Sequence, residues 1–493
     1  MFKLPKEIEE GNIEYKRDLL NVDEERKKHL ASQMKWRVSE GNGEAIYYIG
    51  INDNGSFYGL NYNEINISIK ILKEITNIIN VKINNINKNK INNKYYAIIN
   101  IKNISNKKYF NIGFIGSSKA GKSTLINILS HNITDNGKGS ARLSIFNHKH
   151  EIISGMTSSI GIKILGYKNN ICINEKCIFN NDIINSSNKI INLIDFPGHL
   201  KYYKTIFNKL LSFNLNYLLI VINPFNINYQ LIKFYINYCL ITKKYFSIIF
   251  TNNEKKSFNI TTILNFFKKL KINLNEYDNN IKINKYYYIS ISNINRNNID
   301  LLKKLINNIS NINLKDNNKD EIQIIHKYNN EFLGMIYSGI CLNNNFNVND
   351  DIFIESNGEW HKSKLLSLQV NQLNSSTVYK NCLLGLKLDI NIDKPTIIVK
   401  NINNYNFYNK INLKILYTYY KKINIKEVNK SSYNIIPKSN IDIMLFICNK
   451  IIIGKIIDIN NLTIILKENI LIKNNILFKI GNNYGIGLIY IKK

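Results

Sequence analysis

Long hydrophobic runs are missing from this 493-residue chain. Hydrophobic residues make up 44% of it, yet Asn and Lys interrupt the apolar stretches, and even the longest, such as 217–222, have the length of a strand. A membrane-spanning helix needs about 20 consecutive apolar residues, so we expect none. The first ten residues are charged and lack the apolar core of a secretory signal. We therefore expect a cytoplasmic protein that contacts no membrane.

Paired cysteines are missing too. The six cysteines show neither CxxC spacing nor histidines at metal-ligand distances. We expect reduced, structural thiols, as is usual in the cytosol. The cysteines are Cys172, Cys177, Cys239, Cys341, Cys382 and Cys448.

Acidic residues are scarce: 36 Asp and Glu face 66 Lys and Arg, for a net charge of +30. Such a charge favours contact with RNA or the ribosome, because a basic surface releases counterions from phosphate backbones. Arginine, which makes forked contacts with phosphates and bases, is also scarce, at positions 17, 26, 37, 142 and 296. Asn, Ile, Lys and Tyr, all encoded by A/T-rich codons, are abundant together. A merely solvated basic surface therefore remains the alternative to RNA binding.

The length suits three or four domains. Residues 1–107 begin with a charged leader that we expect to be helical. A strand, an Asn-Gly turn and a second strand follow over 44–60, which predicts a hairpin. Apolar residues then recur at helical spacing over 65–79, and further β-rich runs come after them. This pattern predicts a small α+β domain.

After residue 107 the pattern of apolar residues changes once, near residue 320. Residues 108–315 alternate apolar β runs with helical stretches, which predicts a parallel sheet with crossover helices. From about residue 320 the helical period vanishes, and short strands recur between turn signals. The C-terminal third is therefore expected to be all-β.

The strongest motif follows the predicted strand 110–115. Residues 116–124 read GSSKAGKST, which fits GxxxxGK[ST] in its required place between a strand and a helix. The glycines let backbone N–H groups curl round phosphates, Lys122 reaches the β- and γ-phosphates, and Ser123 ligates Mg²⁺. A chance glycine loop is the alternative, and the loop alone does not separate a GTPase from an ATPase or kinase. Its residues are Gly116, Ser117, Ser118, Lys119, Ala120, Gly121, Lys122, Ser123 and Thr124.

A carboxylate follows the predicted strand 191–194. Asp195 opens the string DFPGH and stands where a Walker-B acid holds Mg²⁺ through water. Gly198 can offer its N–H to the γ-phosphate. His199 stands where an imidazole can orient the attacking water, although a lone surface histidine is more often structural. Asp195 is thus a candidate metal ligand and His199 a candidate catalytic residue.

A polar segment around Thr157 is long enough to be a switch loop. Thr157 lies 34 residues beyond Ser123 and would close on Mg²⁺ and the γ-phosphate in the triphosphate state. A Ser/Thr cluster is ordinarily just a turn, so this role depends on the elements around it. With it, the expected catalytic residues are His199, Lys122 and Thr157, and the expected metal ligands are Ser123, Thr157 and Asp195.

The order of these elements resembles that of the translational GTPases related to elongation factor Tu, and especially their subgroup of GTP-binding proteins one and two. Outside the nucleotide site, the leader strings LPKEIEEGN at 4–12, QMKWR at 33–37 and EGNGEA at 40–45 are similar to that subgroup. The switch segment 148–166 is similar as well. Residues 334–339, which read GMIYSG, resemble the opening of the family's second domain.

This resemblance implies an α/β P-loop GTPase domain at 108–315, behind the small N-terminal α+β domain, and two C-terminal β-barrels at 320–405 and 408–493. It implies hydrolysis of GTP to GDP and phosphate with Mg²⁺, as a conformational switch. It also implies action on the ribosome, aminoacyl-tRNA or another RNA, in elongation or in ribosome or mRNA quality control. A monomer is the default expectation.

The base-reading motif departs from the family pattern. NKxD or TKxD is usual there, whereas this chain has Thr251, Asn252, Asn253 and Glu254 after the predicted strand 246–250. The family's Asp bonds to the guanine N1 and N2 hydrogens, and Glu254 keeps the charge but adds a methylene. We therefore expect weaker guanine binding. Ser292 and Asn293 match the family's other base loop, near guanine O6, which favours GTP over ATP.

The phosphate loop departs as well. Lys119 replaces the Asp that helps the family hold a monovalent cation, and Ser118 replaces a Val. Two expectations follow: either the charge of Lys119 replaces that of the cation, or hydrolysis is slow. A catalytically weakened scaffold that binds nucleotide together with the ribosome or RNA is the main alternative. A P-loop enzyme that uses ATP is a third reading, which two trailing barrels fit poorly.

Overall fold

The structure is a computed structural model. It describes these residues: 4–8, 10–41, 44–79, 81–103, 107–131, 135, 157–177, 179–252, 260–279, 286–311, 320–331, 334–343, 346–375, 378–403, 405–419, 442–447, 450–458, 462–471, 475–480 and 483–490. The chain divides into two compact units, one built on residues 1–106 and the other on 107–373 with 377–493.

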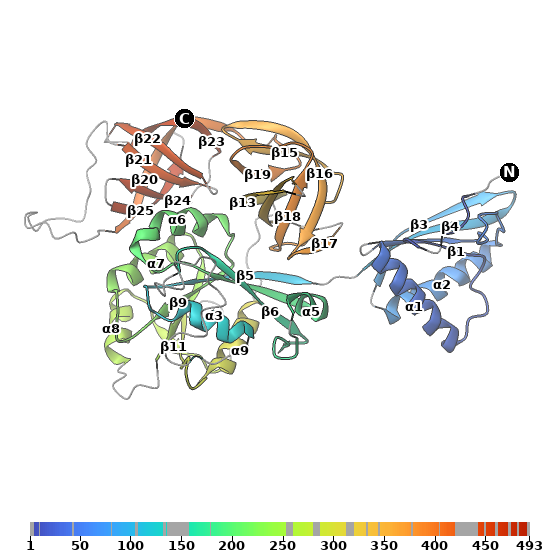
Figure 1. Cartoon of the computed structure of the whole chain (residues 1–493), viewed down its shortest axis with the longest axis horizontal. Helices are drawn as coiled ribbons and strands as arrows, with labels where there is room; N and C mark the ends of the chain where they lie inside the picture. Colours follow the sequence, from blue (N-terminus) through green and yellow to red (C-terminus); the bar gives the residue numbers. More distant parts are fainter. Residues whose placement is uncertain are drawn as a thin grey trace, which may run out of the picture. The chain divides into compact units, whose positions relative to one another are not determined.

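The N-terminal unit is a four-stranded sheet with two helices packed on one face (Figure 1). In sheet order its strands are β1 (Ile13–Lys16), β2 (Glu44–Ile49), β4 (Lys94–Asn103) and β3 (Val81–Ile91). The first two run parallel and the other pairs antiparallel. The helices α1 (Glu24–Glu40) and α2 (Tyr62–Ile78) bury residues such as Met34 and Ile65 against the sheet.

Two expectations for this unit were wrong in detail. The turn before Gly55 forms, with Gly55 at φ +81°, but no second strand follows it. Ile51 and Phe57 make only an isolated bridge, because β2 already has β1 on one side and β4 on the other. The leader, expected to be helical, contributes the strand β1 as well as α1.

A buried arginine anchors the leader. The Arg37 guanidinium contacts Glu7 Oε1 and Glu14 Oε2, each at 2.6 Å. It also donates to the carbonyl oxygens of Ile8 and Gly11 at 3.0 and 3.1 Å. Because a guanidinium presents several donors in a fixed plane, one side chain ties together four points of the leader.

The second unit begins with an eight-stranded sheet, which forms the central domain. The six strands from β11 to β8 are parallel, whereas β6 and β7 are antiparallel additions at one edge. In sheet order the strands are β11 (Leu274–Glu276), β12 (Tyr286–Ser290), β10 (Tyr245–Phe250), β9 (Tyr217–Ile222), β5 (Lys108–Ile115), β8 (Lys189–Asp195), β6 (Gly161–Lys168) and β7 (Ile171–Cys172).

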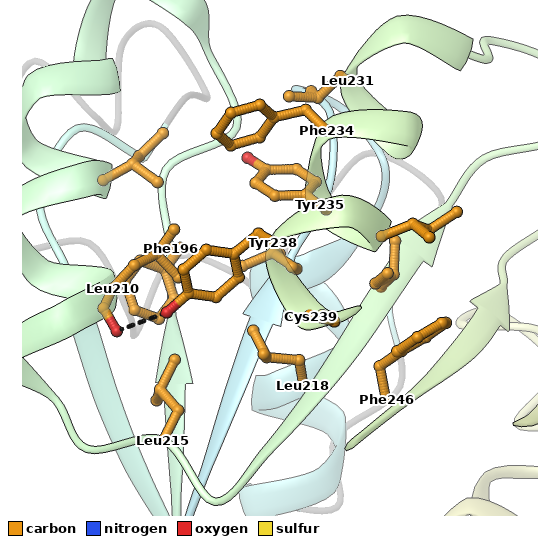
Figure 2. Close-up of a cluster of buried hydrophobic side chains, with 14 of the residues drawn as sticks. Phe196, Leu210, Leu215, Leu218, Leu231, Phe234, Tyr235, Tyr238, Cys239 and Phe246 are labelled. Atoms are coloured by element: carbon orange, nitrogen blue, oxygen red, sulfur yellow. Dashed lines mark hydrogen bonds between the residues drawn. The ribbon is translucent and has the colours of Figure 1, made fainter. Parts of the chain in front are cut away.

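Helices cover both faces of this sheet, which explains why its strands are apolar throughout. One face packs against α3 (Lys122–His131) and α9 (Ile299–Ile309). The other packs against α6 (Tyr203–Ser212), α7 (Tyr229–Ile241) and α8 (Thr261–Lys269). Figure 2 shows this second core, where the Tyr238 hydroxyl donates to the carbonyl of Leu210 at 3.1 Å. The short helix α5 (Asn180–Ser186) lies against β6, and the 3-10 helix η2 (Leu200–Tyr202) precedes α6.

Two six-stranded β-barrels follow, as expected (Figure 1). The first closes where β15 pairs with β16, and β17 extends it. Its strands are β13 (Glu321–Asn330), β14 (Gly334–Cys341), β15 (Asp351–Ser356), β16 (Glu359–Val370), β17 (Leu373–Ser375), β18 (Leu383–Leu388) and β19 (Pro395–Val399). Those of the second are β20 (Phe407–Tyr419), β21 (Asp442–Ile447), β22 (Lys450–Asp458), β23 (Thr463–Leu471), β24 (Asn475–Ile480) and β25 (Asn483–Tyr490). The expected multidomain fold is confirmed.

Buried asparagines join the first barrel to the central domain. Asn111 on β5 donates to the Asn381 carbonyl at 3.1 Å and accepts from Asn192 on β8 at 2.7 Å. Asn214 donates to the side chain of Asn381 at 3.0 Å. The barrel is thus tied to the two strands that lead into the phosphate loop and Asp195.

Membrane helices and disulfides were not expected. No helix among the described residues is long and apolar enough to cross a membrane. The five cysteines within the described ranges are free thiols, and Cys448 lies outside those ranges.

Candidate nucleotide-binding site

The phosphate loop, residues 116–121, joins β5 to α3 at the carboxyl end of the parallel strands, which is where open α/β sheets bind ligands. Gly116 has φ +150°, and a Cβ there would lie 2.2 Å from the carbonyl oxygen of Val221. Gly121 has φ +90°, and the exposed Lys119 has φ +60°. These positive φ values turn the backbone sharply, as a loop that wraps round phosphates requires.

Lys122, the first residue of α3, folds back over this loop. Its Nζ donates to the carbonyl oxygens of Gly116 at 3.1 Å and Ser117 at 2.9 Å. Burial lowers the pKa of Lys122 to about 8, while the charge of Asp195 opposes that shift. The structure thus holds a buried ammonium over the loop, in a position to meet a phosphate.

Three oxygen-bearing side chains meet beside Lys122. Ser123 Oγ donates to Asp195 Oδ2 at 2.5 Å and lies 2.7 Å from Thr157 Oγ1. They come from the start of α3, the end of β8 and the segment before β6, so the fold brings together residues far apart in sequence. A hydroxyl, a carboxylate and a second hydroxyl are hard oxygen ligands of the kind Mg²⁺ prefers. The three residues proposed as metal ligands are therefore neighbours.

Gly198 packs the loop after Asp195 against the phosphate loop. A Cβ at Gly198 would lie 2.5 Å from Lys122 Nζ and 2.6 Å from the carbonyl carbon and oxygen of Ser117. Only glycine fits so close an approach. The backbone at Gly198 therefore lies against the phosphate loop.

His199 is exposed, and its side chain contacts residues that follow it directly in the chain. Its Nδ1 accepts from the backbone N–H of Lys201 at 3.1 Å, and its ring stands edge-on to Tyr202 with centroids 6.3 Å apart. The contacts described for this imidazole are thus with the next turn of chain and not with Ser123 or Lys122.

The base side of the site begins at the end of β10. The buried Thr251 donates from Oγ1 to the Ala120 carbonyl at 3.0 Å, which ties the base-reading segment to the phosphate loop. Asn252 is half-buried, with φ +61°. Asn253 and Glu254 lie outside the described residues, as does the switch segment before Thr157.

The second base loop follows β12. The fully buried Ser292 accepts from the N–H groups of Ile294 at 3.2 Å and Asn295 at 3.0 Å, which shapes the loop. Asn293 is buried beside Gly121, whose added Cβ would lie 3.0 Å from Asn293 Nδ2. Asn293 Oδ1 is buried without a hydrogen-bond partner among the described residues. Such an orphaned amide oxygen, next to the phosphate loop, suits a ligand that brings a donor.

One further feature, at Asp135, was not expected from the sequence. Asp135 is buried, and its backbone N–H donates to the carbonyl of Asn293 at 3.3 Å. It lies in a stretch without periodicity, so no sequence signal pointed to it. Among the remaining residues of the phosphate loop and the start of α3, Ser117 and Ser118 are half-exposed, and Ala120 and Thr124 are buried.

Comparison with known proteins bears on this geometry. Residues 107–228 match the family described as the elongation factor Tu GTP binding domain. The central domain is thus similar to the elongation factor Tu GTP binding domain over residues 107–228. We call it the G domain from here on. The resemblance inferred from the sequence is thereby confirmed.

Relatives of known name are GTP-binding proteins. The chain is 38% identical over 220 residues to GTP-binding protein 2 of Mus musculus, a match covering 43% of this chain and 36% of the mouse protein. It is 34% identical over 196 residues to GTP-binding protein 1 of Xenopus laevis, covering 38% and 30%. The match thus spans about a third of the length of each of these relatives.

Solved structures share the fold over a larger part of the chain. The bacterial selenocysteine-specific elongation factor EF-Sec superposes with a TM-score of 0.55 at 18% identity, over 77% of this chain and 58% of that one. The S. cerevisiae Ski7 GTPase-like domain, bound to GTP, superposes with a TM-score of 0.56 at 14% identity, over 78% and 98%. At such identities the likeness concerns the fold alone.

Proposed function

We propose that this chain binds GTP with Mg²⁺ and hydrolyses it to GDP and phosphate as a conformational switch. The observation that carries the proposal is the meeting of Ser123, Asp195 and Thr157 beside the buried Lys122. A triphosphate that carries a divalent cation needs such a lysine and such oxygens in one place. The family of the G domain supports GTP as the nucleotide.

Each residue has a separate task in this proposal. Lys122 leaves the carbonyls of the phosphate loop and holds the β- and γ-phosphate oxygens, where its charge offsets the charge that develops during hydrolysis. Ser123, Thr157 and Asp195 would hold Mg²⁺, which supplies further charge at the transferring phosphoryl group. Because Thr157 belongs to the segment before β6, its contact would report the γ-phosphate to that segment.

His199 orients the attacking water in this scheme. Its present partner, the N–H of Lys201, must be released before the ring can face the γ-phosphate. We propose that a partner stimulates hydrolysis by selecting the swung-in ring, so that the isolated protein turns over slowly. Lys119, in place of the family's Asp, would slow turnover further.

Guanine recognition is proposed to be intact but weakened. Thr251, Asn252, Asn253 and Glu254 would lie along one side of the base, and Ser292 and Asn293 along the other. The amide nitrogen of Asn293, which lies beside Gly121, is a donor of the kind that guanine O6 accepts. The longer side chain of Glu254 misplaces the carboxylate that reads the guanine N1 and N2 hydrogens.

The partner is proposed to be the ribosome or aminoacyl-tRNA, which the chain would act on as a cytoplasmic monomer. The net charge of +30 and the fold shared with translation factors support this. The asparagine contacts between β5, β8 and the first barrel offer a route from the phosphate loop to that barrel. As domain limits we propose 1–107, 108–315, 320–405 and 408–493.

Competition binding tests the proposal. Fluorescent GTP is titrated into the full chain and displaced with unlabelled GTP, ATP and XTP, with and without Mg²⁺. In Mg²⁺ we expect unlabelled GTP to displace the fluorescent GTP at lower concentrations than ATP or XTP. We then expect ribosomes to stimulate GTP hydrolysis. Preference for ATP, or no binding at all, would refute a GTPase.

A scaffold that binds but does not hydrolyse is the second candidate. It is favoured by the position of His199, whose described contacts lie away from Ser123, and by Lys119 in the phosphate loop. Tight GTP binding without ribosome-stimulated release of phosphate would support the scaffold over the switch.

A further inference from the structure

The N-terminal unit carries a surface on which tyrosine rings and cations alternate. We call it the tyrosine–lysine surface; it comprises Tyr58, Tyr62, Lys88, Lys90, Lys94 and Tyr95. Lys88 and Lys90 lie on β3, and Lys94 and Tyr95 on β4, the two strands of one hairpin (Figure 1). The surface is separate from the nucleotide site, whose described residues belong to the G domain.

Direct contacts link the members of this surface. Lys94 lies 5.8 Å from the Tyr58 ring centroid, Lys88 5.4 Å from that of Tyr62, and Lys90 5.7 Å from that of Tyr95. The rings of Tyr62 and Tyr95 meet edge to face with centroids 5.5 Å apart. A bridge between Leu60 and Tyr95 holds the segment carrying the first two tyrosines beside the start of β4.

A fourth cation at the tyrosine–lysine surface is Arg17, which directly follows β1. The Arg17 guanidinium lies 5.1 Å from the Tyr58 centroid, while its Nε donates to Asp18 at 3.0 Å. Tyr58 therefore lies within reach of two cations. An exposed aromatic ring flanked by cations is the arrangement in which bases stack and phosphates are neutralised.

Charge sets this surface apart from the rest of its unit, and two of its rings are exposed. Tyr58 is 41% exposed and Tyr62 56% exposed, although large aromatic rings are usually covered. Residues 81–103 hold five lysines and no Asp or Glu, whereas residues 1–106 as a whole hold 16 Lys and Arg against 13 Asp and Glu. Codon bias inflates lysine everywhere, but it does not remove acids from one hairpin or place its lysines beside tyrosine rings.

We infer that the tyrosine–lysine surface binds single-stranded RNA. Single strands present unstacked bases to aromatic side chains and phosphates to lysines, so both components of the surface are used. Lysine lacks the forked geometry that reads base edges, so binding should tolerate many sequences. An acidic protein would engage the lysines but would leave the exposed rings unused. The inference goes beyond the proposed GTPase and uses none of its residues.

The lysine component is tested first, with the full chain and no nucleotide. A fluorescein-labelled 12-nucleotide RNA of mixed sequence is titrated at several salt concentrations. K88Q/K90Q/K94Q should bind at least tenfold more weakly, and the slope of log affinity against log salt should fall by about 2, because each lost phosphate contact removes about 0.7. The matched control, K28Q/K35Q/K70Q, removes three exposed lysines from α1 and α2 and should bind like the wild type.

The aromatic component is tested with two paired variants. Y58A/Y62A should lose about tenfold or more in affinity, because stacking one base contributes the equivalent of about five- to 150-fold. Y58F/Y62F keeps both rings and should bind within about twofold of the wild type. Circular dichroism and thermal unfolding check that each variant is folded; if Y58A/Y62A unfolds, Y58A alone against Y58F carries the comparison.

Three outcomes overturn the inference. One is equal binding by the K88Q/K90Q/K94Q and K28Q/K35Q/K70Q variants. Another is equal binding by the alanine and phenylalanine pairs. The third is a preference for duplex RNA of the same length or for polyglutamate, which would indicate a charge-only surface or an acidic protein partner. K122A should bind the RNA normally even if it binds no nucleotide, so failure of the GTPase proposal and failure of this one are told apart.

Discussion

The phosphate side and the base side of the nucleotide site are built in different ways. The phosphate side consists of backbone turned by Gly116 and Gly121 and of short side chains that already contact one another, as Ser123 does Asp195. On the base side, Thr251 serves as a tie to the phosphate loop, while Asn293 keeps an amide oxygen without a partner among the described residues. The side chains of the phosphate side thus already contact one another, whereas the base side keeps a hydrogen-bonding group for a ligand.

This difference has a physical reason. A phosphate is recognised by charge and by several backbone N–H groups, which tolerate changes in neighbouring side chains. A base is read by a few side-chain hydrogen bonds of exact length, so one added methylene changes the result. The departures of this chain from the family pattern should therefore matter more for which base is bound than for whether phosphates are bound.

The largest expected effect is that of removing the buried ammonium. Lys122→Ala should weaken GTP binding about 100-fold, or about 3 kcal/mol, because hydrogen bonds to charged groups contribute that much. Lys119→Ala, which removes an exposed lysine from the same loop, is the matched control and should change affinity less than threefold. Titration with fluorescent GTP measures both. Equal losses would mean that net charge, not the position of Lys122, binds the phosphates.

A smaller effect is expected at the metal ligands. Ser123→Ala and Asp195→Asn should each weaken GTP binding about 30-fold in Mg²⁺, near 2 kcal/mol, through the lost charge-assisted contacts. In excess EDTA the same variants should bind like the wild type. Ser118→Ala, on the half-exposed part of the loop, is the control. A loss of the same size in EDTA would assign these residues to the fold of the loop and not to the metal.

The pH dependence of binding sharpens the comparison further. Burial lowers the pKa of Lys122 to about 8 from its ordinary 10.5. Because phosphates need the protonated lysine, GTP affinity should be level below about pH 7 and fall about tenfold from pH 7 to 9. Stability should move the other way: between pH 8 and 10.5 the unfolded chain binds more protons, so the unliganded protein gains stability as pH rises. Lys122→Ala should show a flat affinity profile.

The phosphate side could be predicted from sequence because its signals are local. Spacing alone placed Lys122 and Ser123 on a strand–loop–helix turn, and Asp195 directly after the predicted strand 191–194. What spacing does not show is a contact over a long separation. The hydrogen bond from Thr251 to Ala120 joins residues 131 apart and depends on how β10 and β5 are ordered in the sheet.

The N-terminal unit shows the same limit. The leader strings resembled the family, yet nothing local indicated that Glu14 lies on a strand and is buried. Its burial depends on Arg37, 23 residues away, whose guanidinium contacts both it and Glu7. From sequence alone, a charged residue is interpreted as exposed, because the partner that compensates for its burial is not known. The strand β1 was therefore missed while the helix that carries Arg37 was expected.

The smallest expected effect lies on the base side and decides how far the comparison holds. Glu254→Asp shortens the side chain by the added methylene and should restore a hydrogen bond to guanine, raising GTP affinity about fivefold, near 1 kcal/mol. ATP affinity should not change, because adenine lacks the N1 and N2 hydrogens that the carboxylate reads. Competition of fluorescent GTP with GTP and ATP gives both values. If GTP affinity stays the same, the carboxylate at 254 does not contact the base, and Ser292 and Asn293 must carry whatever selectivity the protein has.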